Sequence, residues 1–151
     1  MSPTADTHRT DGSTAVADPF DRQAVADLLH RLAAALDERR FTELGELFTV
    51  DGSVATPGGE ARGRPAVAEQ ARRNHAQYRR TQHRMTNVLV DVHAEGAEAQ
   101  LRADAVARFL REGPEPVLTA GAVYRCRAVV CDEGWRLAQV EVEPIWRVDG
   151  P

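Results

Sequence analysis

Two ionisable side chains lie where the sequence pattern predicts the interior of a fold. A strand through YRRTQHRMTNVLVDV, residues 78–92, would place His83 on one face with Met85, Asn87 and Leu89. In the helical stretch DLLHRLAAALDERR, Asp37 continues the edge of the apolar stripe. If these faces meet, the carboxylate can accept a hydrogen bond from one imidazole nitrogen. That bond would fix the tautomer and make the other nitrogen a general base.

The same residues also allow a purely structural interpretation. His83 would then be a hydrogen-bonded core residue, and Asp37 a helix-end charge paired with Arg39 or Arg40. Pattern alone favours this interpretation, because structural ion pairs occupy buried positions just as active sites do. Both interpretations stay open at the level of residue spacing.

Further polar side chains are candidates for binding a substrate. A strand would place Arg108 on the same face as Arg102 and Asp104, and a pocket arginine could hold an enolate, phenolate or carboxylate. Alternatively, Arg102 and Asp104 form a structural pair, or a bulge turns this stretch outward. On the next strand, Tyr124 could donate to a substrate oxygen or be a core tyrosine with a backbone partner. Trp146 could close the wall of the pocket. The other histidines are expected to be solvated or structural: His30, His75 and His93.

Helical and strand periodicities predict one α+β domain over residues 18–147 that positions these side chains. Asp18-Pro19 begins a helix whose apolar stripe runs from Val25 to Leu36, and two further helices cover about 41–48 and 65–78. Four strands follow, roughly 81–92, 97–111, 118–131 and 134–147. About three N-terminal helices would pack on one face of a curved, mainly antiparallel sheet. Residues 1–17 are expected to be a flexible tail and 148–151 a short C-terminal tail.

The composition excludes several classes of function. All 19 basic residues are arginine, so no lysine amine can form a Schiff base with a substrate. The net charge of −4 gives no basic footprint for nucleic acid, and no apolar run is long enough to span a membrane. No metal-ligand spacing is found either. We therefore expect a cytoplasmic protein. Cys126 and Cys131 should stay unpaired, because they point to opposite faces of one strand.

The stretches DLLHRLAAALDERR, TQHRMTNVLV and GWRLAQVEVEPIW together resemble the SnoaL-like branch of the nuclear transport factor 2-like superfamily, over about residues 19–147. Within it, the chain is similar to the scytalone dehydratase and hexachlorocyclohexane dehydrochlorinase families. The resemblance implies a cone-shaped fold with a pocket between the helices and the concave sheet, no cofactor, and a homodimer formed through the sheet. It also implies that Asp37 orients His83, which removes a proton from the substrate.

The sequence departs from both families at positions that line their pockets. Leu36 stands where the dehydratases have a tyrosine, and GSVAT supplies no tyrosine on the next short strand. Arg108 aligns with a second pocket histidine of the dehydratases, and Ile145 lies near a late arginine of the dehydrochlorinases. A different substrate is therefore expected.

These observations predict a cofactor-independent lyase, isomerase or cyclase that acts on a small apolar, polyketide-like or cyclic substrate. His83 and Asp37 would be catalytic, and the substrate-binding residues would be Arg108, Asn87, Tyr124, Met85 and Trp146. One alternative is an epoxide hydrolase of the limonene-epoxide-hydrolase type, whose water would be activated by Arg102, Asp104 and Glu141. Another is a non-catalytic member of the fold that binds a small ligand or a partner protein.

Overall fold

One open sheet forms the frame of the molecule, whose computed structural model describes residues 19–151. The tail predicted at 1–17 lies outside the described residues. The strands are β1 (Phe48–Thr56), β2 (Gly59–Arg62), β3 (Arg80–His93), β4 (Glu98–Leu110), β5 (Leu118–Cys131) and β6 (Gly134–Asp149). Their order across the sheet is β2-β1-β6-β5-β4-β3. β1 runs parallel to β6, and every other neighbouring pair is antiparallel, as the predicted class requires.

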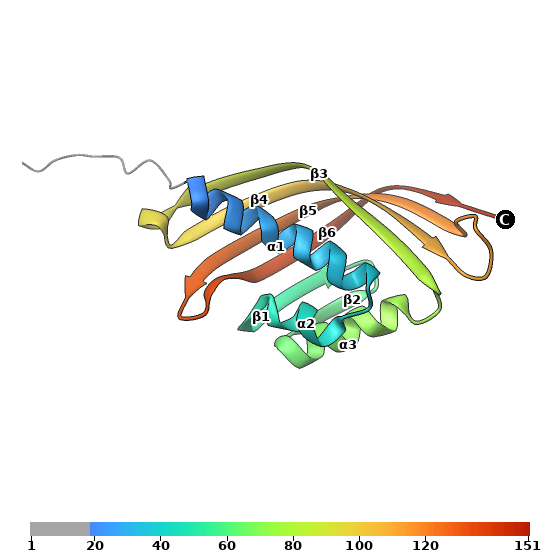
Figure 1. Cartoon of the computed structure of the whole chain (residues 1–151), viewed down its shortest axis with the longest axis horizontal. Helices are drawn as coiled ribbons and strands as arrows, with labels where there is room; N and C mark the ends of the chain where they lie inside the picture. Colours follow the sequence, from blue (N-terminus) through green and yellow to red (C-terminus); the bar gives the residue numbers. More distant parts are fainter. Residues whose placement is uncertain (1–18) are drawn as a thin grey trace, which may run out of the picture.

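Three helices pack against this sheet: α1 (Pro19–Asp37), α2 (Phe41–Glu46) and α3 (Arg64–His75). α1 lies along the concave face, while α2 and α3 lie beside β1 and β2 (Figure 1). A 3₁₀ turn, η1 (Ala94–Gly96), connects β3 to β4. The apolar stripe predicted for the first helix is buried: Val25, Leu28, Leu29, Leu32 and Leu36. Burying each such leucine contributes about 1.5–3 kcal/mol, so this stripe fixes α1 on the sheet.

Several element ends differ from the predicted ones. The second helix ends at Glu46 because Phe48 begins β1, and SVATP, predicted as a short extended piece, is part of the β1–β2 hairpin. The third helix ends at His75 rather than near Tyr78. β6 continues to Asp149, where it still pairs with β5. Residues 148 and 149 therefore belong to the sheet and not to a C-terminal tail.

A bulge in β3 changes which side chains face the helices. Asn87 has a left-handed backbone, with φ at 50°, and the pairing with β4 shifts between Thr86 and Leu89. Asn87 and Leu89 consequently lie exposed on the face away from the helices. The prediction that they share a face with His83 is wrong. The inward-facing residues are His83 and Met85 before the bulge, and Val88, Val90 and Val92 after it.

β4 alternates small inward residues with charged outward ones. Its buried residues are mostly alanine and join the same core as α1: Ala99, Ala103 and Ala105. On the other face, Arg102 lies 3.0 Å from Asp104, and Arg125 of β5 lies 3.7 Å from Glu143 of β6. The outer face of the sheet therefore carries ion pairs, rather than the alanine- and valine-rich surface predicted for a dimer.

Candidate active site

Asp37 and His83 meet at the end of α1. His83 Nδ1 lies 2.6 Å from Asp37 Oδ1, and the backbone N–H of His83 donates to Asp37 Oδ2 at 2.8 Å. Thr81 Oγ1 also donates to Asp37 Oδ1, at 3.1 Å. Only 5% of the His83 side chain is exposed, against 22% for Asp37. Because a carboxylate accepts hydrogen bonds, Nδ1 carries the hydrogen and Nε2 keeps the lone pair.

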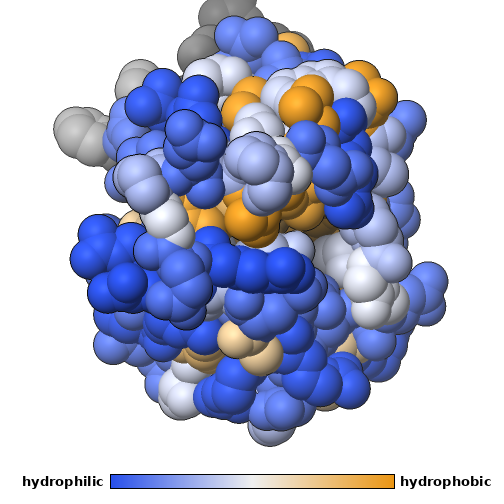
Figure 2. Space-filling model, turned by 90° about the vertical axis from the view of Figure 1, so that its right-hand side faces the viewer, coloured by the Kyte–Doolittle hydropathy of each residue, from blue (hydrophilic) through white to orange (hydrophobic). Residues whose placement is uncertain are grey.

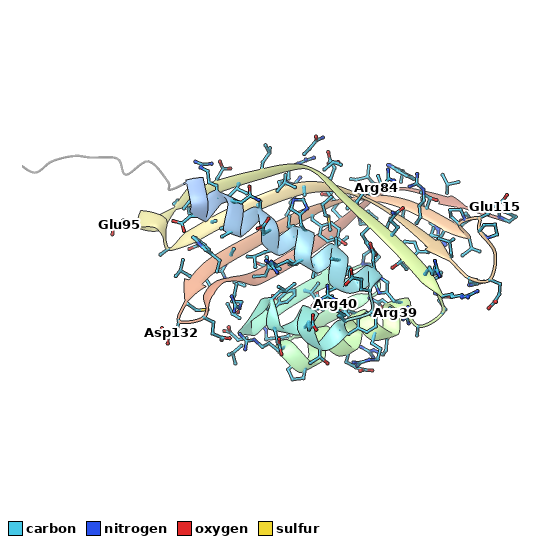
Figure 3. The ribbon with its side chains drawn as sticks, viewed as in Figure 1. Arg39, Arg40, Arg84, Glu95, Glu115 and Asp132 are labelled. Carbon is cyan, nitrogen blue, oxygen red and sulfur yellow. The ribbon has the colours of Figure 1, made fainter. Side chains whose placement is uncertain are left out.

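Asp37 occupies an unfavourable end of its helix, and β3 compensates for this. A carboxylate in the last turn faces the negative end of the helix dipole, and the last turn of α1 contains no basic residue. The hydrogen bonds from Thr81 and His83 offset this repulsion. Arg39 and Arg40 lie at the α1–α2 connection (Figure 3) and bind elsewhere. Arg39 donates to backbone carbonyls at the end of α3, and Arg40 pairs with neighbouring glutamates. The alternative in which either arginine pairs with Asp37 is therefore wrong.

His83 lines a cavity of about 720 Å³ between α3, the end of α1 and the concave face of the sheet. Small-molecule sites commonly measure about 300–1,000 Å³. Viewed from the end of the molecule, hydrophobic surface lies in a hollow between two hydrophilic regions (Figure 2). Most of the wall is apolar and includes Leu32, Leu36, Phe48, Val67, Phe109 and Val142. The site thus combines an oriented imidazole with an apolar pocket.

Aromatic rings surround the His83 imidazole. Phe109 meets it edge-on, with ring centroids 5.7 Å apart, and the His75 ring lies 5.6 Å away. Phe109 also contacts His75 and Tyr78. These rings exclude water from the imidazole and restrict its orientation, which leaves the cavity side as the approach for a ligand.

His75 is buried in the cavity wall, although it was expected to be solvated or structural. Its Nδ1 donates to the Ala71 carbonyl at 2.8 Å. Burial lowers the pKa of His75, so the ring is neutral near pH 7. Gln70, on the same helix, also lines the cavity and is 3% exposed. Sequence reasoning missed both residues, although His75 follows Ala71 by four positions on the apolar face of α3.

Two of the predicted substrate-binding residues reach the cavity. Tyr124 is 8% exposed and lines the wall. Burial raises the pKa of its phenol, so the hydroxyl keeps its proton at neutral pH. Trp146 borders the cavity, with its indole over Gly121 of β5. Met85 shares the inward face of β3 but packs in the core instead of lining the cavity.

Arg108 and Asn87 lie outside the cavity, so the prediction that they could stabilise an oxyanion there is wrong. Ala107 and Phe109 point inward on β4, and the alternation of the strand turns Arg108 to the opposite face. The bulge in β3 likewise turns Asn87 outward, where it donates to Asp104 at 2.9 Å. Arg84 also projects from β3 on the side away from the helices (Figure 3).

The residues of the epoxide-hydrolase alternative lie on the outer face as well. Strand register aligns Arg102, Arg125 and Glu141 across β4, β5 and β6. Glu141 is exposed and accepts a hydrogen bond from Gln139, while Arg102 is paired with Asp104. This set does not converge inside the cavity that His83 lines. The geometry therefore gives no support to water activation by these residues.

Metal ligation finds no cluster in residues 19–151, where no three His, Cys, Asp or Glu side chains are grouped to bind an ion. Both cysteines, Cys126 and Cys131, are free thiols, as their spacing predicted. No helix in the described part of the chain is long and apolar enough to cross a membrane.

A cavity between three helices and the concave face of an open, mixed sheet defines the nuclear transport factor 2-like class of fold, also called cystatin-like. Residues 20–141 match the SnoaL-like domain, and the chain belongs to this family. Its sequence matches no curated protein.

Solved structures share this fold at low sequence identity. A scytalone dehydratase-like protein from Novosphingobium aromaticivorans superposes with a TM-score of 0.77 and 23% identity, over 87% of this chain and 89% of that chain. A type 2 hexachlorocyclohexane dehydrochlorinase gives a TM-score of 0.75 and 18% identity, over 89% and 94%. A protein of unknown function from Mycobacterium tuberculosis gives 0.70 and 27%, over 83% and 75%.

Proposed function

We propose that the protein is a cofactor-independent lyase, isomerase or cyclase that removes a proton from a small apolar, cyclic or polyketide-like substrate. The observation that carries this proposal is the Asp37–His83 pair, 2.6 Å between Oδ1 and Nδ1, in the wall of an apolar cavity. The names of two structural neighbours, a dehydratase and a dehydrochlorinase, denote eliminations that remove a proton together with a leaving group.

The proposed first step breaks a C–H bond next to a carbonyl group of the substrate. The proton passes to Nε2 of His83, and the electron pair stays on the substrate as an enolate. Asp37 stabilises the imidazolium through Nδ1–H, and the Tyr124 hydroxyl donates to the enolate oxygen. The imidazolium then returns the proton to a leaving group in a lyase, or to another atom of the substrate in an isomerase or cyclase.

The first prediction concerns hydrogen exchange at an enolisable probe. With 1-tetralone in D₂O, the parent protein should catalyse loss of the α-hydrogen signal in the proton NMR spectrum. His83→Gln should slow this exchange by on the order of 10²- to 10⁴-fold, because the base is lost. The matched control is His30→Gln, which changes an exposed histidine of α1 and should leave the rate unchanged. A His83→Gln protein that exchanges at the parent rate would rule out His83 as the base.

The second prediction concerns the orienting role of Asp37. Asp37→Asn keeps the shape of the side chain but adds a donor beside Nδ1, which favours the tautomer with hydrogen on Nε2. Exchange should fall by on the order of 10²-fold or more. Ring ¹⁵N NMR should show Nε2 without hydrogen in the parent and with hydrogen in the variant. An unchanged tautomer with unchanged exchange would contradict the orienting role.

A further inference from the structure

α3 presents two buried polar side chains to the cavity without using their outer nitrogen atoms in the fold. Gln70 is 3% exposed and His75 8% exposed, and both line the cavity. Within residues 19–151, Nε2 of each has no hydrogen-bond partner. Native proteins pair roughly nine in ten buried polar groups, because an unpaired one destabilises the fold. Two unpaired atoms in one cavity wall indicate a ligand that completes their hydrogen bonds.

The His75 ring restricts what that ligand carries at its end of the cavity. Nδ1–H is already used, because it donates to the Ala71 carbonyl at 2.8 Å. The ring is neutral near pH 7, since burial lowers the pKa of His75. Nε2 is therefore an acceptor and requires a hydroxyl or N–H donor from the ligand. The ring lies 6.0 Å from Phe109 and 5.6 Å from His83, so this donor is attached to a flat apolar skeleton that fits between rings.

Gln70 sets a complementary requirement at a second point. Its Nε2 is a donor and pairs with an oxygen that carries no hydrogen, such as a carbonyl. Gln70 lies five residues before His75 on α3, a rise of about 7.5 Å along the helix axis. The cavity wall between and opposite them is largely apolar, with Val67 and Phe48 among its residues. A ligand that reaches both nitrogens therefore holds its two polar groups apart on a ring-sized skeleton.

We propose that the cavity binds a hydroxylated cyclic ketone, whose hydroxyl donates to His75 Nε2 and whose carbonyl oxygen accepts from Gln70 Nε2. A ketone of this kind is enolisable, as the proposed proton transfer requires. The inference deepens the proposed function and rests on it only in taking the same cavity as the ligand site. Catalysis by His83 is not required for this binding.

Isothermal titration calorimetry with three matched probes tests the assignment in the full chain. The first probe, 6-hydroxy-1-tetralone, carries both groups. 6-Methoxy-1-tetralone removes the hydroxyl donor, and 5,6,7,8-tetrahydro-2-naphthol removes the carbonyl. The parent protein should bind the hydroxy ketone about tenfold more tightly than either analogue, one hydrogen bond being lost in each case.

Two variants assign each preference to its residue. His75→Phe keeps an aromatic ring without an acceptor, and should bind the hydroxy and methoxy ketones equally. Gln70→Met keeps the length of the side chain without a donor, and should bind the hydroxy ketone and the naphthol equally while still preferring hydroxy over methoxy. His75→Gln restores an acceptor and should recover part of the hydroxyl preference, which keeps the test decisive if His75→Phe does not fold.

Thermal unfolding without ligand separates a binding role from a structural one. Gln70→Met should raise Tm, because it removes an unpaired buried donor, whereas a residue needed for the fold would lower Tm. His83→Gln should keep both ligand preferences, so failure of the proposed base would leave this inference standing. Equal affinity of the parent for hydroxy and methoxy ketones, or no binding of any probe, would overturn the inference.

Discussion

His75 keeps a neutral imidazole in the same wall as the proposed base. Burial is the main cause that lowers the pKa of His75, and the charges of His83 and Arg39 lower it further. The hydrogen bond to the Ala71 carbonyl and the Asp37 carboxylate act in the opposite direction. Protonation of this ring is therefore disfavoured in the folded protein relative to the unfolded chain.

This difference predicts the sign of a pH effect on stability. In the unfolded chain a histidine binds a proton below about pH 6.5, whereas folded His75 does so only at lower pH. The unfolded state then holds more protons, so the free energy of unfolding should fall as pH decreases from about 7 to about 5. Urea denaturation across this range should give a flatter pH dependence for His75→Phe than for the parent. Equal slopes in the two proteins would show that His75 protonates alike when folded and unfolded.

Residue spacing predicted the contact between Asp37 and His83, but not their neighbours on α3. The contact was predictable because the helical stripe and the start of β3 are both regular up to these positions. Gln70 and His75 were missed because α3 is rich in arginine and its polar residues were assigned to the wet side. A buried glutamine or histidine has no hydrophobic signature, and only the packed structure shows that its nitrogen lacks a partner.

At the scale of elements, the bulge in β3 decides which half of the strand faces the cavity. The alternation of the sequence contains its signal: inward Met85 is followed by Val88 and Val90, which breaks the period of two. An uninterrupted strand placed Asn87 inward and the valines outward. The error therefore came from extending one register past a residue that tolerates the left-handed backbone.

The left-handed backbone at Asn87 predicts the effect of two substitutions. Asn87→Val places a β-branched residue at φ 50° and should lower the free energy of unfolding by about 1–2 kcal/mol. Asn87→Gly accepts this backbone, and should lose little beyond the hydrogen bond to Asp104. Chemical denaturation of both variants measures the difference. If valine proved as stable as glycine, the bulge would not be required by the fold.

β4 shows why the outer face of the sheet was hard to predict. Alanine is weakly hydrophobic, so the alternation of Ala103 and Ala105 with Arg102 and Asp104 does not say which side is buried. The charged side was assigned to the cavity because charges suggested chemistry. In the structure, the small side chains fill the space below α1, and the charged ones pair with each other on the outer face.

For the whole molecule, the homodimer implied by the family stays a prediction, and the structure narrows where to test it. Exposed apolar side chains cluster at the end of β6: Ile145, Trp146 and Val148, at 57%, 45% and 59%. A stable interface buries about 1,200–2,000 Å², more than three side chains supply, so the ion-paired rows of the outer face would also be covered.

Sedimentation velocity should therefore give the mass of two chains at low salt and a shift toward one chain at high salt, because screening weakens the exposed pairs. Val148→Glu should favour the single chain. The control is Val50→Glu, which alters a valine that is 74% exposed on β1. A monomeric parent at low salt would contradict the predicted dimer.

The parallel pairing of β1 with β6 has a consequence for the order in which the molecule is made. Val54 and Val140 are register partners, yet more than half of the chain separates them. Such long-range contacts form slowly, because the intervening loop must close before they can stabilise anything. During synthesis, the helices and β1 leave the ribosome long before the strand that completes their wall. The cavity is therefore a late product of folding, and until β6 docks, the apolar faces of α1 and β1 are exposed to chaperones and to aggregation.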